Sequence, residues 1–204
     1  INNMLRDLWS ASDGHLTGFK DRVLLHEVVQ GVLAANEQNF VTKSLLVENR
    51  IPADLPVLTV DRLKFQRLFE LLIKDEIVSL PAGTQITLSA KVLGGAVGDK
   101  AEVQIELQDN GPGLPEEALR LVFDPFSLRS DSPLEYGINL MAVYFIVHHH
   151  GGRIEAKSEA GRGTTFLITM PVNCEQAPRV EENQQLLSKV LLNDTLWEKL
   201  MTSD

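Results

Sequence analysis

The chain has 204 residues and a formal net charge of -9, and 44% of its residues are hydrophobic. This composition is typical of a soluble globular protein with one domain and helical extensions, or with two small domains. The acidic balance argues against a nucleic-acid partner and against contact with an anionic membrane, because both would attract clustered Lys and Arg. The single cysteine, Cys174, excludes an internal disulfide and suits a reducing compartment, so we expect a cytoplasmic domain. The longest apolar stretch, residues 138–147, is well short of the roughly 18 residues of a membrane-spanning helix. A cytoplasmic domain is compatible with a membrane anchor elsewhere in a parent protein.

The hydrophobic periodicity predicts helices and strands without a regular strand–helix–strand alternation. Helices are expected at about residues 1–12, 24–38, 62–80, 115–122, 138–149 and 181–201, and strands at 44–47, 57–60, 85–93, 102–108, 153–159 and 164–171. Asp61 is expected to cap the helix that follows it, and the glycine-rich segment 94–99 to join two strands as a hairpin. This mixture indicates the α+β class.

The chain is expected to divide into three parts. Residues 1–14 form the end of a helix and a linker, residues 20–173 form the main domain, and residues 178–204 form a separate amphipathic helix. The apolar side of that last helix, which includes Trp197, must be covered. We expect it to pack back on the domain; pairing with a second copy and docking of a partner are the alternatives.

Several glycine-bearing segments follow one another in a fixed order. They are residues 109–117 (DNGPGLPEE), 123–126 (FDPF), 137–154 from Gly137 to HGGRI, and 161–166 (GRGTTF). In this order they resemble the G1, F, G2 and G3 boxes of the ATP-binding domain of two-component sensor histidine kinases, a branch of the superfamily that includes gyrase and the large heat-shock chaperones. The resemblance covers about residues 21–172. It implies the Bergerat ATPase fold, a two-layer sandwich in which a mixed, mostly antiparallel sheet is covered on one face by helices.

The resemblance implies a role for each motif residue. Asp109 would accept a hydrogen bond from the adenine amino group, which discriminates against guanine because guanine carries an oxygen acceptor at that position. Gly111 and Gly113 would let the backbone approach the nucleotide, and Thr164 would contact adenine directly or through water. The other expected nucleotide-binding residues are Leu114, Phe126, Gly137, Ile138, Asn139 and Leu140. Without the family pattern, Asp109 would be interpreted as the cap of a turn and Thr164 as an ordinary strand residue.

The phosphates are expected at backbone N–H groups at the start of the helix 138–149, where the helix dipole favours anions. The family pattern there is Gly-x-Gly-Leu-Gly-Leu, whereas residues 135–140 read EYGINL and keep only the middle glycine. Glu135 adds a negative charge near the phosphates, and Asn139 adds a side chain where the backbone should pass closely. The segment 127–135 corresponds to the ATP lid, and its Arg129 either reaches the γ-phosphate or stays in solvent.

The helix 62–80 departs from the family as well. Family members carry an asparagine that binds Mg²⁺, four residues after another polar residue; we place Glu70 and Lys74 at these two positions. Lys74 cannot ligate a metal but could contact phosphate directly, and Glu70 could orient a water or the phosphoacceptor. In an alternative register, Asp75 is the Mg²⁺ ligand, although it would then share the apolar stripe of the helix and face the core. A third interpretation makes residues 74–76 solvated charges.

The favoured function is phosphotransfer. ATP, with Mg²⁺ implied by the family, would give its γ-phosphoryl group to a histidine on an upstream dimerisation domain. Residues 1–14 would form the end of the last helix of that domain. A response regulator would then receive the phosphoryl group. A homodimer is expected for the full-length protein, and this chain by itself is not expected to autophosphorylate. The main alternative is a pseudokinase, a degenerate nucleotide-sensing or nucleotide-free interaction module; an anti-sigma-type serine kinase or a phosphotransferase with a vestigial ATPase domain is a third. A metal site at residues 148–150 is rejected, because consecutive helical side chains point in different directions.

Overall fold

The computed structural model describes residues 19–94, 101–120, 122–123 and 133–175, the side chains of 133–138 excepted. The expected end helices 1–14 and 178–204, Phe126 and Arg129 lie outside these residues. Within the described parts of the chain, none of the helices has both the length and the apolar character that crossing a bilayer requires.

A five-stranded sheet forms one of two layers. Its order is β2 (Leu46–Asn49), β4 (Gln85–Leu93), β5 (Glu102–Asp109), β7 (Gly163–Pro171) and β6 (Arg153–Glu159). Only the pair β2–β4 is parallel, and the other three pairs are antiparallel. A separate two-stranded sheet pairs β1 (Asp21–Val23) with β3 (Leu58–Val60).

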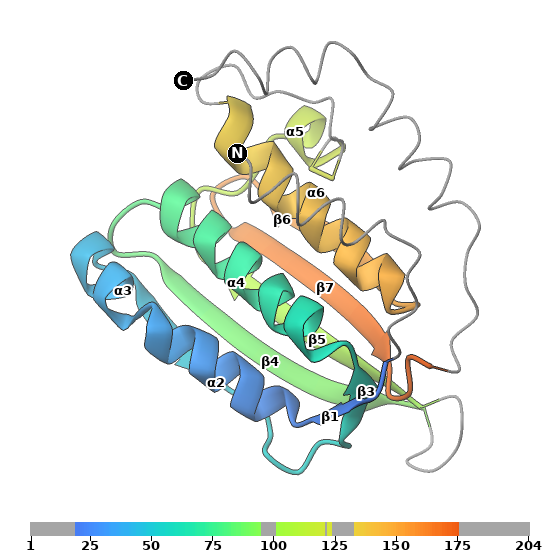
Figure 1. Cartoon of the computed structure of the whole chain (residues 1–204). Helices are drawn as coiled ribbons and strands as arrows, with labels where there is room; N and C mark the ends of the chain where they lie inside the picture. Colours follow the sequence, from blue (N-terminus) through green and yellow to red (C-terminus); the bar gives the residue numbers. More distant parts are fainter. Residues whose placement is uncertain (1–18, 95–100, 121, 124–132, 176–204) are drawn as a thin grey trace.

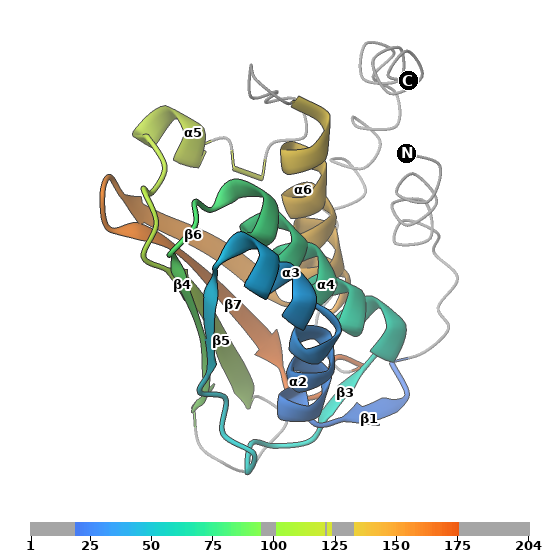
Figure 2. The same cartoon turned by 90° about the vertical axis from the view of Figure 1, so that its left-hand side faces the viewer.

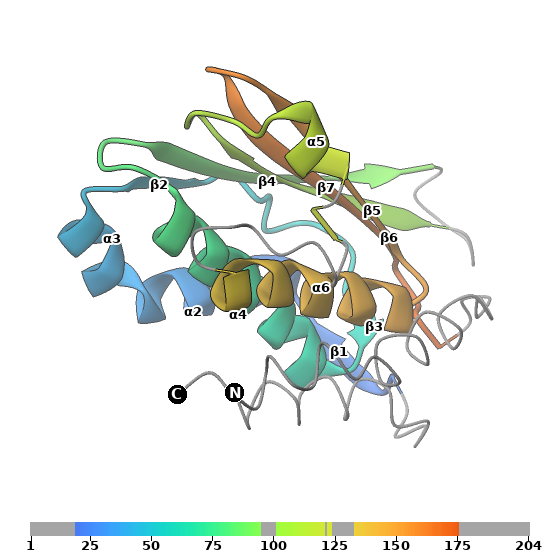
Figure 3. The same cartoon turned by 90° about the horizontal axis from the view of Figure 1, so that it is seen from above.

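The second layer consists of helices on one face of this sheet. The helices α2 (Leu25–Ala35), α4 (Arg62–Ser79) and α6 (Pro133–His149) lie side by side there, with α3 (Glu37–Lys43) following α2 (Figure 1). Figure 3 shows the sheet and the helices as two separate layers. The short α5 (Glu116–Arg120) lies beside the β6–β7 hairpin (Figure 2). The expected α+β sandwich with a mixed, mostly antiparallel sheet is therefore confirmed.

Side-chain alternation explains which face of the sheet the helices cover. In β5, Val103, Ile105 and Leu107 are at most 2% exposed and point to the helices, while the residues between them are more exposed. Because side chains alternate across a strand, the next residue on the helix-facing side is Asp109. A carboxylate therefore continues an apolar row into the space between the layers.

A buried histidine fixes the start of α4 against α6. The backbone N–H of Asp61 donates to His150 Nε2 at 3.2 Å, and His150 Nδ1 lies 2.7 Å from the carbonyl oxygen of Ile146. Both contacts require the neutral ring with its proton on Nδ1, and burial lowers the pKa of His150. Asp61 in turn accepts the N–H of Lys64 at 3.2 Å, which confirms the expected helix cap.

Two helix boundaries differ from the sequence-based expectation. The predicted helix 24–38 is divided into α2 and α3 at Asn36, whose side-chain amide donates to the carbonyl oxygen of Val32 and so competes with continuation of the helix. The predicted helix 138–149 begins five residues earlier, at Pro133. Proline is favoured at the first position of a helix, and only one glycine follows it before Leu140.

Candidate functional site

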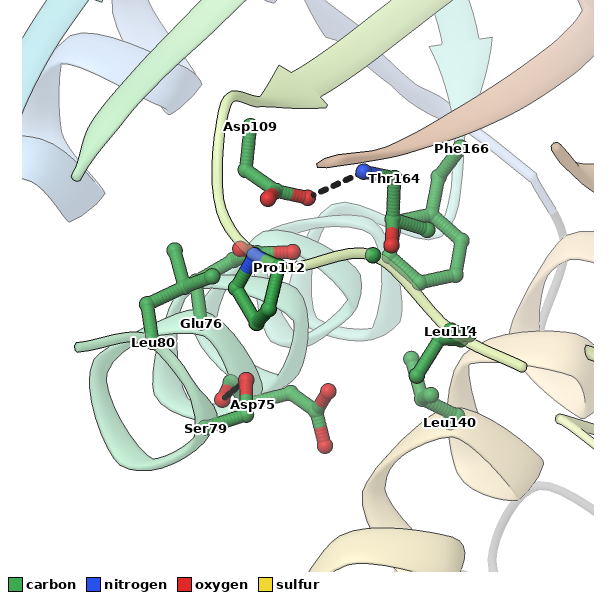
Figure 4. A pocket seen from close by; sticks show the side chains of 11 residues that line it. Asp75, Glu76, Ser79, Leu80, Asp109, Pro112, Leu114, Leu140, Thr164 and Phe166 are labelled. Carbon is green, nitrogen blue, oxygen red and sulfur yellow. Dashed lines mark hydrogen bonds between the residues drawn. The ribbon is translucent and has the colours of Figure 1, made fainter. Parts of the chain in front are cut away.

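The centre of the candidate site is Asp109, at the end of β5. Its side chain is 3% exposed. Oδ1 accepts the backbone N–H of Gly111 at 2.6 Å. Oδ2 accepts that of Thr164 at 2.8 Å, the bond marked in Figure 4. These two bonds fix the orientation of the carboxylate, yet each oxygen can accept one more hydrogen bond. Asp109 is thus a preformed acceptor.

The glycines next to Asp109 allow close approach of the backbone. A Cβ at Gly111 would lie 2.7 Å from Asp109 Oδ1 and 2.8 Å from Leu80 Cδ2. Gly113 has a φ of +71°, and a Cβ there would collide with the carbonyl group of Glu159. The loop therefore needs glycine at 113 to lie against the β6–β7 hairpin and glycine at 111 to lie against Asp109 and Leu80.

Ser158 ties this loop to the hairpin. Its Oγ accepts the N–H of Leu114 at 2.7 Å and donates to the carbonyl oxygen of Gly163 at 2.9 Å. It also lies 3.1 Å from the hydroxyl of Thr164. The sequence analysis missed Ser158, although it is a polar residue in phase with the apolar Ile154 and Ala156 of β6, which was the available signal.

A cavity of about 110 Å³ opens beside Asp109, between the loop, the end of α4 and α6 (Figure 4). Its described lining residues are Asp75, Glu76, Ser79, Leu80, Asp109, Pro112, Gly113, Leu114, Leu140, Thr164 and Phe166. The structure thus brings together five of the expected nucleotide-binding residues and the alternative metal ligand. Three of the five polar side chains in this lining are acidic, and none of these residues is a cation.

At the end of α4, Glu70 and Lys74 lie outside the cavity lining. Lys74 lies on the exposed side of the helix, and Glu70 is bonded to Gln66 and Arg67, each at 2.9 Å. Burial opposes ionisation of Glu70, but these hydrogen bonds and the charge of Arg67 outweigh it and lower its pKa. Neither residue lines the cavity, whereas Asp75, which is 5% exposed, does.

Glu76 is a second residue of the site that sequence reasoning missed. It is 3% exposed, and its Oε2 has no hydrogen-bond partner. Figure 4 shows its carboxyl group pointing toward that of Asp109. Burial raises the pKa of Glu76 well above its ordinary value, and the charges of Asp109 and Asp75 raise it further. The signal was its spacing of four residues from both Leu72 and Leu80, which are buried on the same face.

The start of α6 differs from the arrangement expected for the phosphate site. Because the helix begins at Pro133, the amides of Gly137, Ile138, Asn139 and Leu140 lie inside the helix rather than at its N-terminus. Asn139 is 1% exposed, its Oδ1 has no hydrogen-bond partner, and it does not line the cavity. Leu140 is buried and forms part of the cavity wall. Among the described residues, no group of three His, Cys, Asp or Glu side chains is arranged to hold a metal ion.

Comparison with known proteins places this site in a family. The family model described as histidine kinase-, DNA gyrase B- and HSP90-like ATPase matches residues 60–173. The chain belongs to this family. The matched segment contains the whole cavity, from Asp75 on α4 to Phe166 on β7.

Individual relatives agree with this assignment. The adaptive-response sensory kinase SasA of Synechococcus elongatus is 34% identical over 152 residues, which cover 74% of this chain and 38% of that relative. The catalytic domain of the histidine kinase ThkA superimposes with a TM-score of 0.63 at 19% identity, over 76% of this chain and 97% of that one. Full-length ShkA, solved in complex with AMPPNP, superimposes with a TM-score of 0.70 at 17% identity, over 83% of this chain and 34% of that one. The chain spans less than half the length of the curated relatives it matches first.

Proposed function

We propose that this chain is the ATP-binding domain of a sensor histidine kinase and that Asp109 receives the amino group of adenine. The observation that carries the proposal is the Asp109 carboxylate, which two backbone amides hold at the inner end of a cavity. A fixed acceptor in a partly apolar pocket selects a base that presents a donor there.

The residues around Asp109 fit the base end of a nucleotide. Leu114, Leu140 and Phe166 supply apolar walls, and Thr164 supplies a hydroxyl group. The cavity of about 110 Å³ is smaller than the roughly 300–1,000 Å³ of pockets that enclose a whole drug-sized ligand, so it would hold only part of ATP. The ribose and phosphates would extend out of it.

Asp75 is the residue that we propose for the metal. It lies on the α4 wall of the same cavity, across from Leu140 (Figure 4). Mg²⁺ prefers carboxylate oxygen and keeps several waters, so one protein carboxylate together with the phosphates suffices. Bound there, Mg²⁺ would neutralise part of the phosphate charge. Lys74 does not line this cavity.

The whole protein would complete the reaction. The γ-phosphoryl group would pass from ATP to a histidine nitrogen on an upstream dimerisation domain, with ADP as the leaving group. A response regulator would then receive it. Support comes from the sensory kinases that match this chain over less than half of their own length.

A second candidate, a pseudokinase, is favoured by two observations. Three carboxyl groups, of Asp75, Glu76 and Asp109, line a small cavity that has no cation among its described lining residues. The backbone amides of residues 137–140 lie within α6, where they donate the hydrogen bonds of the helix. Both features weaken the attraction for a triphosphate.

Calorimetric titration of the 204-residue chain with ATP, with and without Mg²⁺, tests the proposal. We expect binding that strengthens with Mg²⁺ and weakens at least tenfold in Asp109→Asn, because the amide would turn a donor toward one of the two backbone N–H groups or toward the base. Asp54→Asn, at an exposed acid that does not line the cavity, is the matched control. Absence of binding at millimolar ATP would leave the pseudokinase as the function.

A further inference from the structure

We propose that the outer face of α6 is the docking surface for residues 181–201 of this same chain, which would lie along α6 as an antiparallel helix. This inference goes beyond the proposed function and does not depend on it. It gives the apolar side of the C-terminal segment a defined partner surface, and it would explain why α6 is buried on every side.

Helix α6 differs from its neighbours in exposure. None of residues 139–150 is exposed, and seven of the eight positions from 140 to 147 are buried, Tyr144 being the exception. In contrast, α2 and α4 each have an exposed side, which carries Gln30 in α2 and Leu63 in α4. A helix that is apolar all round has to be covered all round.

The sheet and α4 cover two sides of α6. Val147 faces the sheet, because a Cβ added at Gly152 would lie 2.7 Å from Met170 Sδ on β7 and 3.1 Å from Val147 Cγ1. His150 faces α4, because its Nε2 accepts the backbone N–H of Asp61. In the row of α2, α4 and α6, α6 is the last helix and has α4 on one side only (Figure 1).

Two large apolar side chains point in the opposite directions. Successive helical residues are turned by about 100°, so Phe145 lies about 160° around the helix from Val147, and Met141 lies about 180° from His150. Phe145 therefore points away from the sheet and Met141 away from α4, yet they are only 4% and 2% exposed. A part of the chain other than the sheet and α4 covers this outer face, which we define by Met141, Ala142 and Phe145.

The path of the chain brings the C-terminal segment to this face. The N–H of Cys174 donates to the carbonyl oxygen of Thr59 at 3.1 Å, two residues before Asp61, which is bonded to His150 at the end of α6. Extended, residues 176–180 span about 17 Å. A helix over residues 181–201 would be about 31 Å long, against about 25 Å for the 17 residues of α6. The segment can thus reach the last turn of α6 and run back along the whole helix.

The side chains of this segment match the outer face. An antiparallel arrangement would place Glu181 and Glu182 beside the end of α6, where Lys64 Nζ lies 3.2 Å from His149 Nε2. Opposite charges would then meet where the segment begins. Its apolar stripe would lie on Met141 and the neighbouring apolar side chains, and consists of Leu186, Leu187, Val190, Leu191, Trp197 and Leu200.

The segment before Phe19 is the rival occupant. The ring of Phe19 lies 5.1 Å from those of His149 and His150, so the N-terminal segment also joins the described residues near the last turn of α6. A helix over residues 1–12 would be about 18 Å long, which is shorter than α6. It is also expected to continue a preceding domain. We therefore assign the outer face to residues 181–201.

Oxidation of methionine by hydrogen peroxide tests this on the 204-residue chain, with mass spectrometry to follow each methionine separately. Met141 should react slowly in the unchanged chain. Leu187→Glu combined with Leu191→Glu puts two charges into the apolar stripe and should speed oxidation of Met141 by at least about tenfold. Met170, which is 0% exposed on β7, should stay protected and so show that the domain remains folded.

Two double variants are the controls. Gln185→Glu with Asn193→Glu adds the same charge to the other side of the same segment, and Leu5→Glu with Leu8→Glu makes the same change in the N-terminal segment. Both should leave Met141 protected.

The other outcomes overturn the proposal. They are continued protection of Met141 in the first variant, exposure of Met141 by the N-terminal variant alone, and protection that falls on dilution of the unchanged chain, which would identify a second copy as the occupant. If the first variant also exposes Met170, the emission of Trp197 in Trp9→Phe decides instead. Weak quenching by iodide supports docking of the segment, and quenching as strong as in the unfolded chain refutes it.

Discussion

Replacing Glu76 by glutamine should stabilise the folded chain progressively as the pH rises. Burial raises the pKa of Glu76, with Asp109 and Asp75 adding to the effect, so the folded chain keeps a proton that the unfolded chain releases near pH 4.5. Stability is then fully present below about pH 4.5 and is lost as the pH rises through the elevated folded pKa. Glutamine has nearly the same shape but cannot ionise.

The magnitude follows from linkage. One proton retained only in the folded state changes the free energy of unfolding by about 1.4 kcal/mol per pH unit. The difference between Glu76→Gln and the unchanged chain should grow at up to this slope above about pH 5 and level off once Glu76 ionises in the folded state. The measurement is urea unfolding followed by far-ultraviolet circular dichroism, at intervals between about pH 5 and pH 9, with the difference in unfolding free energy plotted against pH.

Glu70→Gln is a control of opposite sign on the same helix. The pKa of Glu70 is lowered, because its hydrogen bonds to Gln66 and Arg67 outweigh its burial. Its stabilisation is present above the unfolded pKa and is lost as the pH falls. A pH-independent difference between Glu76→Gln and the unchanged chain would show that Glu76 ionises as an ordinary glutamate, and the argument for a neutral acid in the cavity would fail.

Three further results are expected. Gly113→Ala should lower the free energy of unfolding by more than about 1 kcal/mol and weaken ATP binding. The control Gly161→Ala, also at positive φ but with no atom within 4 Å of the new Cβ, should lower the free energy of unfolding less and leave ATP binding unchanged. Equal effects of the two substitutions in urea unfolding would contradict the close approach at Gly113. Ser158→Ala should cost about 1–3 kcal/mol by leaving an amide of the glycine loop without a partner; thermal unfolding measures this, and a neutral effect would show that water replaces the hydroxyl. Burial raises the pKa of the Cys174 thiol to about 12, so iodoacetamide near pH 8 should alkylate it only after unfolding; rapid labelling of the native chain, followed by mass spectrometry, would contradict its burial.

Much of the sheet could be predicted from local pattern. The bounds of β4 and β6 agree with the sequence-based ranges, and Asp109 lies where the alternation of β5 puts it. A strand facing a helical layer on one side only has a strict two-residue period, so its buried residues can be identified without the tertiary structure. The role of Asp61 as a helix cap was predictable for a similar reason, because a capping side chain bonds to backbone amides within the first turn of its own helix.

The acidic end of α4 could not be placed in this way. Positions 70 and 74, 71 and 75, and 72 and 76 are all four apart, so spacing does not decide which pair faces the ligand. The sequence analysis placed Lys74 near the phosphates, with Asp75 on the apolar stripe as the alternative ligand and solvated charges at 74–76 as a third interpretation. In the structure Lys74 is exposed, whereas Asp75 and Glu76 line the cavity between α4 and the loop after Asp109. The sequence analysis also began the helix α6 too late. The family pattern has three glycines at this point, which suggested a turn before the helix, whereas residues 135–140 keep only one of them.

The state of Glu76 also decides whether the same cavity can accept a triphosphate. If all three lining carboxyl groups were ionised, a charge of about −3 would face a polyanion in a poorly solvated space, and no cation lies among the described lining residues to offset it. On the proposed function, Asp109, which already accepts two backbone amides, would receive the base, and Asp75 would contribute to binding Mg²⁺, which would reverse the local sign where the phosphates begin. On the proposed function, a proton on Glu76 would lower the negative charge that faces the phosphates from about −3 to about −2. Mg²⁺ should accordingly strengthen ATP binding to the unchanged chain and to Glu76→Gln, and it should do so much less in Asp75→Asn, whose amide oxygen is a weaker ligand.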